Sequence, residues 1–229
     1  MGNAFTTTLA TASAETLTAV NDMFKLCGLR EVAALDTGNA SQAGDAERIL
    51  DDVRDEILSR GWHQNTEYDV EYTPASSDDE IDLGSDILAI DSWVGRSNGH
   101  PGAKNVVKRG SRLYDIDENS FAFTTISSLK TRIIRRLDMS YLTIPLQRHI
   151  SGEAAVRLYR MHVKGRGMNR QAAWLDLENS IIGEARLRRA EAYRDNQEHS
   201  DWNILNSEHS RNVRGRRVRY VSGIQSTTI

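Results

Sequence analysis

The chain has 229 residues, of which 39% are hydrophobic, and a formal net charge of −3. This length is enough for one full-sized domain, and the slightly acidic balance argues against a protein that attracts nucleic acid through a global basic field. No apolar run approaches the roughly 20 residues that cross a membrane. The single cysteine, Cys27, excludes an internal disulfide and a cysteine-rich metal site. We therefore expect a cytosolic protein at the time of synthesis, with no membrane partner.

The N-terminal part of the chain predicts two amphipathic helices. Leu17, Val20, Phe24 and Cys27 recur at helical spacing, which places them on one face of a helix over residues 14–27. A second helix, over residues 42–60, carries an apolar stripe made of Ala46, Ile49, Leu50, Val53 and Ile57. Because glycine adopts the left-handed conformation without strain, Gly28 and Gly61 are expected to end these helices.

Between residues 68 and 138 the pattern changes from helical to strand-like. Tyr68, Val70 and Tyr72 alternate with charged residues, as on a half-buried strand. Turn-forming pairs such as Pro101-Gly102 separate further short apolar runs. The expected strands cover residues 68–72, 87–91, 105–108, 113–117, 121–124 and 132–136. Short strands joined by tight turns predict a small antiparallel sheet or barrel inserted between helices.

Two more helices are expected in the C-terminal part. The first begins near Pro145, a residue suited to a first helical turn. The second, over residues 169–198, would be a rod of about 45 Å, longer than a domain of this size needs. Leu177 and Ile181 give its first half an apolar face, whereas the sequence from Arg186 onward is mostly charged residues and alanine. We expect the first half to pack in a bundle and the second half to project.

The last segment contains few apolar side chains, so it is expected to be an extended tail that does not fold alone. The predicted fold class is α+β: a mainly α-helical bundle with a long C-terminal helix, a small antiparallel β-rich insertion and an extended C-terminal tail. The expected division is residues 1–66 for the first bundle helices, 67–140 for the insertion, 141–198 for the last bundle helices and 199–229 for the tail.

Side chains capable of catalysis form no recognised pattern in this sequence. The acidic run Asp78 to Asp82 lacks the glycine turn of a calcium loop, which favours a solvated loop. Asp115 and Asp117 would lie on one side of a strand, as a metal-dependent hydrolase requires, although polar residues on an exposed sheet face are the commoner case. The six histidines show no metal-ligand pair at helical spacing, and Cys27 is expected to be a buried, unreactive thiol. We expect no enzyme and no cofactor.

A basic segment near the C-terminus has two interpretations. It runs from Arg211 to Tyr220 and contains Arg214, Arg216, Arg217 and Arg219. A flexible arm of this kind binds nucleic acid through phosphate contacts and counterion release. Arginines dock equally well on carboxylates of another protein. The acidic balance of the remaining chain favours the protein partner.

Three short stretches carry a resemblance to a known family. They are Leu17-Thr18-Ala19-Val20-Asn21-Asp22-Met23, Leu58-Ser59-Arg60-Gly61-Trp62 and Leu113-Tyr114-Asp115. In their order and spacing, and together with the long charged helix, they resemble tail tubular protein A, the head–tail adaptor family of short-tailed phages. The resemblance covers residues 17–206.

The resemblance implies a structural protein of the virion neck, present in the host cytoplasm before assembly. Such adaptors form a ring, commonly of twelve copies, between the portal protein and the tail nozzle protein. Genomic DNA passes through the lumen without specific binding. The helical bundle would supply subunit contacts, the β-rich part would face the nozzle, and the C-terminal tail would reach the portal. No catalytic residue is implied.

Candidate contact residues follow from the resemblance together with the charged residues of the C-terminal segment and of the last helix. The expected portal-binding residues are Arg211, Arg214, Arg216, Arg217, Arg219 and Tyr220, and the expected subunit-interface residues are Glu184, Arg188, Glu191, Arg194 and Glu198. Alternating charges on a projecting helix suit the head-to-tail interface that a closed ring needs. Two alternatives remain open: a nucleic-acid-binding packaging protein that uses the arginine-rich tail, and a metal-dependent hydrolase that uses Asp115, Asp117 and the acidic loop.

Overall fold

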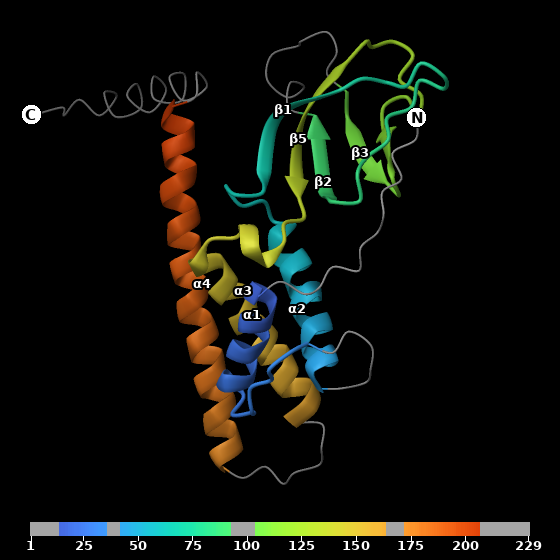
Figure 1. The fold of residues 1–229 in the computed structure, drawn as a ribbon. Coiled ribbons are helices and arrows are strands. Elements are labelled where there is room, and N and C mark those ends of the chain that lie inside the picture. Colours follow the sequence, from blue (N-terminus) through green and yellow to red (C-terminus); the bar gives the residue numbers. More distant parts are fainter. Residues whose placement is uncertain (1–13, 36–41, 93–103, 164–171, 207–229) are drawn as a thin grey trace, which may run out of the picture.

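A computed structural model describes residues 14–35, 42–92, 104–163 and 172–206, with side chains up to 161 and from 175 to 199 in the last two segments. The helices form one part of the molecule and the strands form another, placed beyond one end of the helices (Figure 1). This arrangement confirms the α+β class, with a long C-terminal helix and small antiparallel sheets. Within the described residues, no helix is both long and apolar enough to span a membrane.

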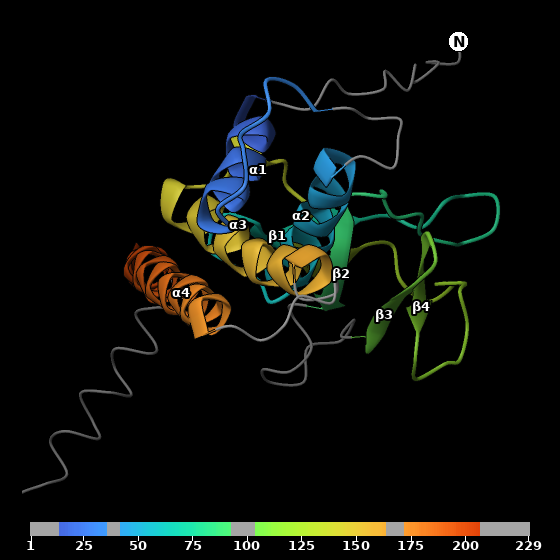
Figure 2. The ribbon, with the colours of Figure 1, turned by 90° about the horizontal axis from the view of Figure 1, so that it is seen from below.

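In the described residues, four α-helices build the bundle: α1 (Ala14–Leu26), α2 (Gln42–Leu58), α3 (Ile144–Leu158) and α4 (Ala172–Asn206). A short 3-10 turn, η1 (Met139–Tyr141), precedes α3, and a π-helical turn, η2 (Tyr159–Val163), follows it. Helix α3 lies in the middle and contacts α1, α2 and α4 (Figure 2). Its buried side chains Leu146, Ile150 and Leu158 therefore form the centre of the helical core.

The glycines expected to end the first two helices do so. Gly28 has a φ of +69° and Gly61 a φ of +76°, which are left-handed values. The Leu29 N–H donates to the Phe24 carbonyl at 2.8 Å and the Gly28 N–H to the Lys25 carbonyl at 3.1 Å, a pattern that satisfies the last carbonyls of α1. Both helices end one or two residues before the expected bounds.

The β-rich part, as far as the structure describes it, contains five strands: β1 (Thr66–Tyr72), β2 (Ile87–Ser92), β3 (Val106–Arg109), β4 (Arg112–Asp115) and β5 (Leu129–Arg135). One antiparallel sheet has the order β1-β5-β2, and β3 and β4 form a separate hairpin. Asp69, with a φ of +58°, lies where the register of β1 shifts against β5. Buried apolar side chains, among them Leu113, Phe123 and Ile133, give this part its own core.

The sequence predicted five of the six expected strands, and the sixth, over residues 121–124, is absent. Phe123 is fully buried there, and its backbone N–H donates a single hydrogen bond to the Asp79 carbonyl at 2.7 Å. The apolar pattern of this segment therefore reflects burial of a loop and not strand pairing. The expected strand at 113–117 is also shorter, because β4 ends at Asp115 and Asp117 lies in the following turn.

The last helix is longer than expected at its C-terminal end. It continues to Asn206, so residues 199–206, which were expected to belong to an extended tail, are helical. The end of α4 lies on the side of the bundle where the strands are (Figure 1).

Candidate functional site

The second half of α4 is attached to the bundle and does not project freely, contrary to expectation. One stripe of the helix stays in contact with the rest of the chain from Leu177 to His199. The buried or partly buried members of this stripe are Leu177, Ile181, Ala185, Arg188, Ala192, Asp195 and Asn196. Beyond Ala185 these residues are small or polar, so they leave no apolar pattern in the sequence. Polar and aromatic contacts therefore hold the second half in place.

The first of these contacts is centred on Arg188. Its guanidinium forms an ion pair with Asp22 of α1, and its Nε donates to Glu184 Oε1 at 2.9 Å. The Ser151 hydroxyl of α3 donates to Asp22 Oδ2 at 2.6 Å. Burial raises the pKa of Asp22, but the hydrogen bonds from Arg188 and Ser151 outweigh burial, so the pKa lies below its usual value. The network joins α1, α3 and α4.

A close approach of two backbones accompanies this network. A Cβ atom added at Gly152 of α3 would lie 3.3 Å from Ala185 Cα and 3.2 Å from Arg188 Cδ. Such contacts are tighter than side chains normally make, so glycine is the residue that permits this helix spacing. Among the described elements, α3 and α4 make the most extensive contact.

Three aromatic rings form the second contact, one turn further along α4. Trp62, which follows α2, lies with its ring centroid 5.0 Å from that of Tyr193 on α4 and 6.0 Å from that of His149 on α3. His149 is 1% exposed, and neither ring nitrogen has a hydrogen-bond partner among the described residues. Burial, with nearby Arg189 and Arg60, lowers the pKa of His149 to about 4. The imidazole is therefore neutral at physiological pH.

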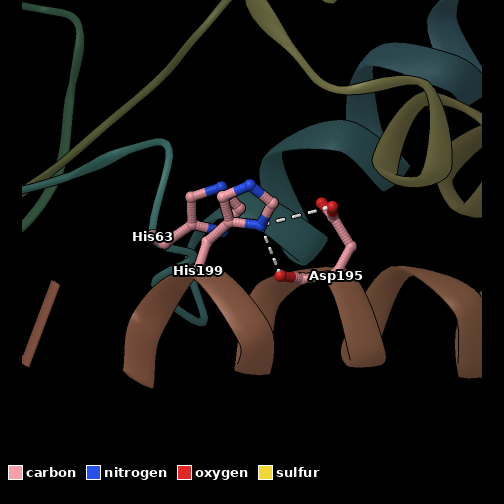
Figure 3. Close-up of side chains that lie close together, drawn as sticks. All are labelled: His63, Asp195 and His199. Atoms are coloured by element: carbon pink, nitrogen blue, oxygen red, sulfur yellow. Dashed lines mark hydrogen bonds and ion pairs between the residues drawn. The ribbon is translucent and has the colours of Figure 1, made fainter. Parts of the chain in front are cut away.

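A third contact ties the end of α4 to the loop before β1 (Figure 3). The His63 backbone N–H donates to Asn196 Oδ1 at 2.7 Å, and the rings of His63 and His199 stack with centroids 4.7 Å apart. Asp195 lies beside His199, one helical turn earlier. One ligand atom from each of His63, Asp195 and His199 lies within 4.8 Å of the others. Among the described residues, this is the group that could hold a metal ion.

The outer face of α4 carries exposed charges. Glu191, Arg194 and Glu198 are all exposed. Arg194 and Glu198 are 3.9 Å apart with side chains 77% and 70% exposed, so this pair contributes little to stability. Of the five expected interface residues, these three are presented to solvent, whereas Glu184 and Arg188 are bonded within the chain. The role of all five at a subunit interface stays a prediction.

A comparison with protein families gives one match that covers most of the chain. The model of a family described as tail tubular protein matches residues 17–199. The chain belongs to the tail tubular protein family. Among curated proteins, none matches the chain.

Membership of this family supports a structural role in a phage tail, located in the tail of the virion and involving self-association. The matched region contains the whole bundle core, the β-rich part and α4 as far as His199. The family is one of structural proteins and not of enzymes, as the resemblance implied. The expected portal-binding residues, from Arg211 to Tyr220, lie outside the described residues.

The carboxylates considered for hydrolysis have structural partners in this family member. Asp115 is fully buried, lies 3.0 Å from Lys104 Nζ, and its Oδ1 accepts the backbone N–H of Asp117 at 2.9 Å. In the acidic loop, Glu80 forms an ion pair with Arg112 at 2.6 Å. These contacts stabilise a turn and a hairpin, and within the described chain neither aspartate belongs to a possible metal-binding group.

The expectation for Cys27 is confirmed. Burial raises the pKa of its thiol to about 11, and its Sγ lies 3.4 Å from the Ala155 carbonyl. The metal-ligand cluster, in contrast, was missed by sequence reasoning. Asp195 and His199 are four residues apart on a helix, which is a visible signal, but His63 lies more than 130 residues earlier in the chain.

Proposed function

We propose that this tail tubular protein is the head–tail adaptor, which assembles as a ring between the portal and the tail nozzle and encloses a passage for DNA. Family membership supports a tail role, and the resemblance described above suggests the adaptor position within the tail. In this proposal the twelvefold copy number and the two partners come from that resemblance.

The observation that carries the proposal is the two-sided character of α4. Its inner side is fixed by the Asp22–Arg188 network and by the contact of Asn196 with His63, so the helix is held against the bundle. Its outer side presents Glu191, Arg194 and Glu198, charges that find little compensation in their own chain. A closed ring needs a head-to-tail interface between two different surfaces, and a rigid helix with exposed charges of both signs suits one of them.

The proposed portal contact is made by the C-terminal segment. Residues 207–229 follow α4 directly, and 23 residues in extended form reach at most about 75 Å. This reach exceeds the length of the bundle helices. The segment could therefore meet a partner at either end of the bundle, although α4 ends on the side where the strands are. A tail that orders on its partner couples folding to binding.

The test is the mass of the full chain, alone and with isolated portal rings, by light scattering or native mass spectrometry. We expect a ring that forms or is stabilised on the portal. Substituting Glu191, Arg194 and Glu198 together by alanine should weaken ring formation. The matched control replaces exposed Glu71 and Lys130, which face each other on β1 and β5, by alanine and should leave the ring intact.

A second variant separates ring formation from portal binding. Deletion of residues 211–229 should leave a folded protein that no longer joins the portal. Normal portal attachment of this truncated chain would contradict the proposed role of the tail. A full-length protein that does not bind the portal but binds DNA in a salt-sensitive manner would contradict the adaptor proposal and favour a packaging role.

A further inference from the structure

We propose that His63, Asp195 and His199 bind one divalent transition-metal ion, with Zn²⁺ as the ion that fits best. Two imidazoles and one carboxylate are a ligand set that Zn²⁺ accepts with a fourth position left for water. The ligand atoms lie within 4.8 Å of one another, so rotation of one side chain can bring them to a common centre. The proposal is independent of the adaptor function.

The hydrogen bonds around the two imidazoles set their tautomers. His63 Nδ1 lies 3.0 Å from Asn196 Oδ1, and His199 Nδ1 lies 2.9 Å from the Asp195 carbonyl oxygen. Both oxygens only accept hydrogen bonds, so each Nδ1 carries the proton and donates it. The Nε2 atom of each neutral ring is consequently left with a lone pair. His63 therefore shows the arrangement common among metal-binding histidines, with Nδ1 oriented by an oxygen and Nε2 left for the ion, whereas His199 exchanges its Nδ1 hydrogen bond for the ion when it turns.

The carboxylate is oriented in a similar way. Gln64 Nε2 donates to the Thr143 hydroxyl at 2.7 Å, and that hydroxyl donates to Asp195 Oδ2 at 3.0 Å. The other oxygen, Oδ1, lies on the side of His199, at 3.4 Å from its Nδ1. Asp195 therefore has one oxygen held by the protein and one available to an ion.

One change of conformation is required for binding. The two rings are nearly parallel, with an interplanar angle of 10° (Figure 3). An ion bound by an imidazole lies in the plane of that ring, so one ion cannot satisfy two parallel stacked rings. His63 is fixed by Asn196, whereas the side chain of His199 is 55% exposed and has room to turn. Metal binding should therefore open the stack by rotating His199.

The consequence for the fold is a cross-link between distant parts of the chain. His63 precedes β1, and the other two ligands lie near the C-terminal end of α4. An ion bound at this position holds the last turns of α4 against the loop that leads into the sheet. Because the site exists only in the folded chain, the ion stabilises the folded state by mass action.

The experiment uses the untagged, metal-free full chain titrated with Zn²⁺ by calorimetry, and with Co²⁺ by absorption spectroscopy. We expect one ion per chain and a Co²⁺ spectrum of a low-coordinate site. His199→Ala and Asp195→Asn should each weaken Zn²⁺ binding about 100-fold, and Thr143→Val about tenfold. Asp176→Asn removes an exposed carboxylate near the other end of the same helix and should leave Zn²⁺ binding unchanged. At 100 times the dissociation constant, Zn²⁺ should raise the melting temperature by about 5–10 °C.

Two results would overturn the proposal. One is the absence of saturable binding at one ion per chain. The other is a His63→Ala, His199→Ala double variant that binds Zn²⁺ as tightly as the parent chain while its circular dichroism spectrum is unchanged. His199 is exposed, so the single His199→Ala variant is expected to fold. If the double variant does not fold, the single variant decides the test in the same way.

Discussion

Replacement of the buried His149 by leucine should remove part of the pH dependence of folding. The imidazole packs beside the rings of Trp62 and Tyr193, and in the described part of the chain neither of its nitrogens has a hydrogen-bond partner. Its pKa is about 4 in the folded chain, against an ordinary value of 6.5. Between these pH values the unfolded chain binds a proton that the folded chain does not. The free energy of unfolding therefore falls as the pH falls through this interval.

The size of the effect follows from the two pKa values. A difference of 2.5 units corresponds to about 3 kcal/mol when the pH is below both values. At pH 5.0 the loss is about 2 kcal/mol, and at pH 7.5 it is negligible, as the same linkage relation gives. Leucine has a similar volume and no ionisable group, so His149→Leu should change stability at pH 7.5 by less than about 1.5 kcal/mol.

The assay is urea unfolding of both proteins at pH 7.5 and pH 5.0, followed by tryptophan fluorescence. Other groups contribute to the pH dependence. Asp22, whose pKa is lowered, destabilises the fold as it protonates, and Asp51, whose pKa is raised by burial, has the opposite effect. These contributions are common to both proteins and cancel in the comparison. If parent and variant lose equal stability between the two pH values, within about 0.5 kcal/mol, the reasoning on a neutral buried imidazole is refuted.

Three further predictions concern packing, a buried amide and the thiol. Gly152→Ala should lower the free energy of unfolding by about 1–3 kcal/mol, because the added Cβ would lie 3.3 Å from Ala185 Cα. Gly183→Ala should raise the free energy of unfolding by about 0.5–1 kcal/mol, because the added Cβ has nothing within 4 Å. Asn65→Ala should lower the free energy of unfolding by about 2–4 kcal/mol in the same urea assay, since the Asn65 amide accepts a hydrogen bond from the Trp62 N–H and donates to the Leu58 and Arg135 carbonyls. A loss below about 1 kcal/mol would show that water replaces these hydrogen bonds. Cys27 should react with a thiol reagent only on unfolding, and rapid reaction of the native chain at pH 7.5 would contradict its burial.

The parts of the fold that the sequence predicted are those with a strong local signal. Helix α2 has an apolar stripe at helical spacing followed by a glycine, and both features are independent of the remaining chain. Phe123 shows the limit of this reasoning. Its apolar neighbourhood predicted a strand, but whether a buried segment pairs with another depends on what lies beside it, and here a loop carbonyl of Asp79 takes the place of a partner strand.

The candidate sites depend on contacts between distant residues, which explains why the sequence revealed them only in part. Arg188 was expected as a subunit-interface residue on the projecting half of the helix, and its partner Asp22 lies more than 160 residues earlier, where no local pattern links the two. Glu191 and Arg194 were expected at a subunit interface; they are exposed in the structure, and their role at an interface stays a prediction. Of the histidine cluster, only the pair on α4 has a local spacing; the approach of His63 follows from how the loop after α2 meets the helix.

The place where the chain enters and leaves the β-rich part has a consequence for the evolution of this protein. Thr66 at the start of β1 and Ile134 near the end of β5 are direct partners across antiparallel strands. Their Cα atoms therefore lie about 5 Å apart, and each side of this junction has its own apolar core. Because the two ends of the β-rich part lie side by side, this part can gain or lose residues, or be replaced by another domain, while the helices keep their packing. Tails of different phages could thus diversify at this end of the molecule without redesigning the bundle.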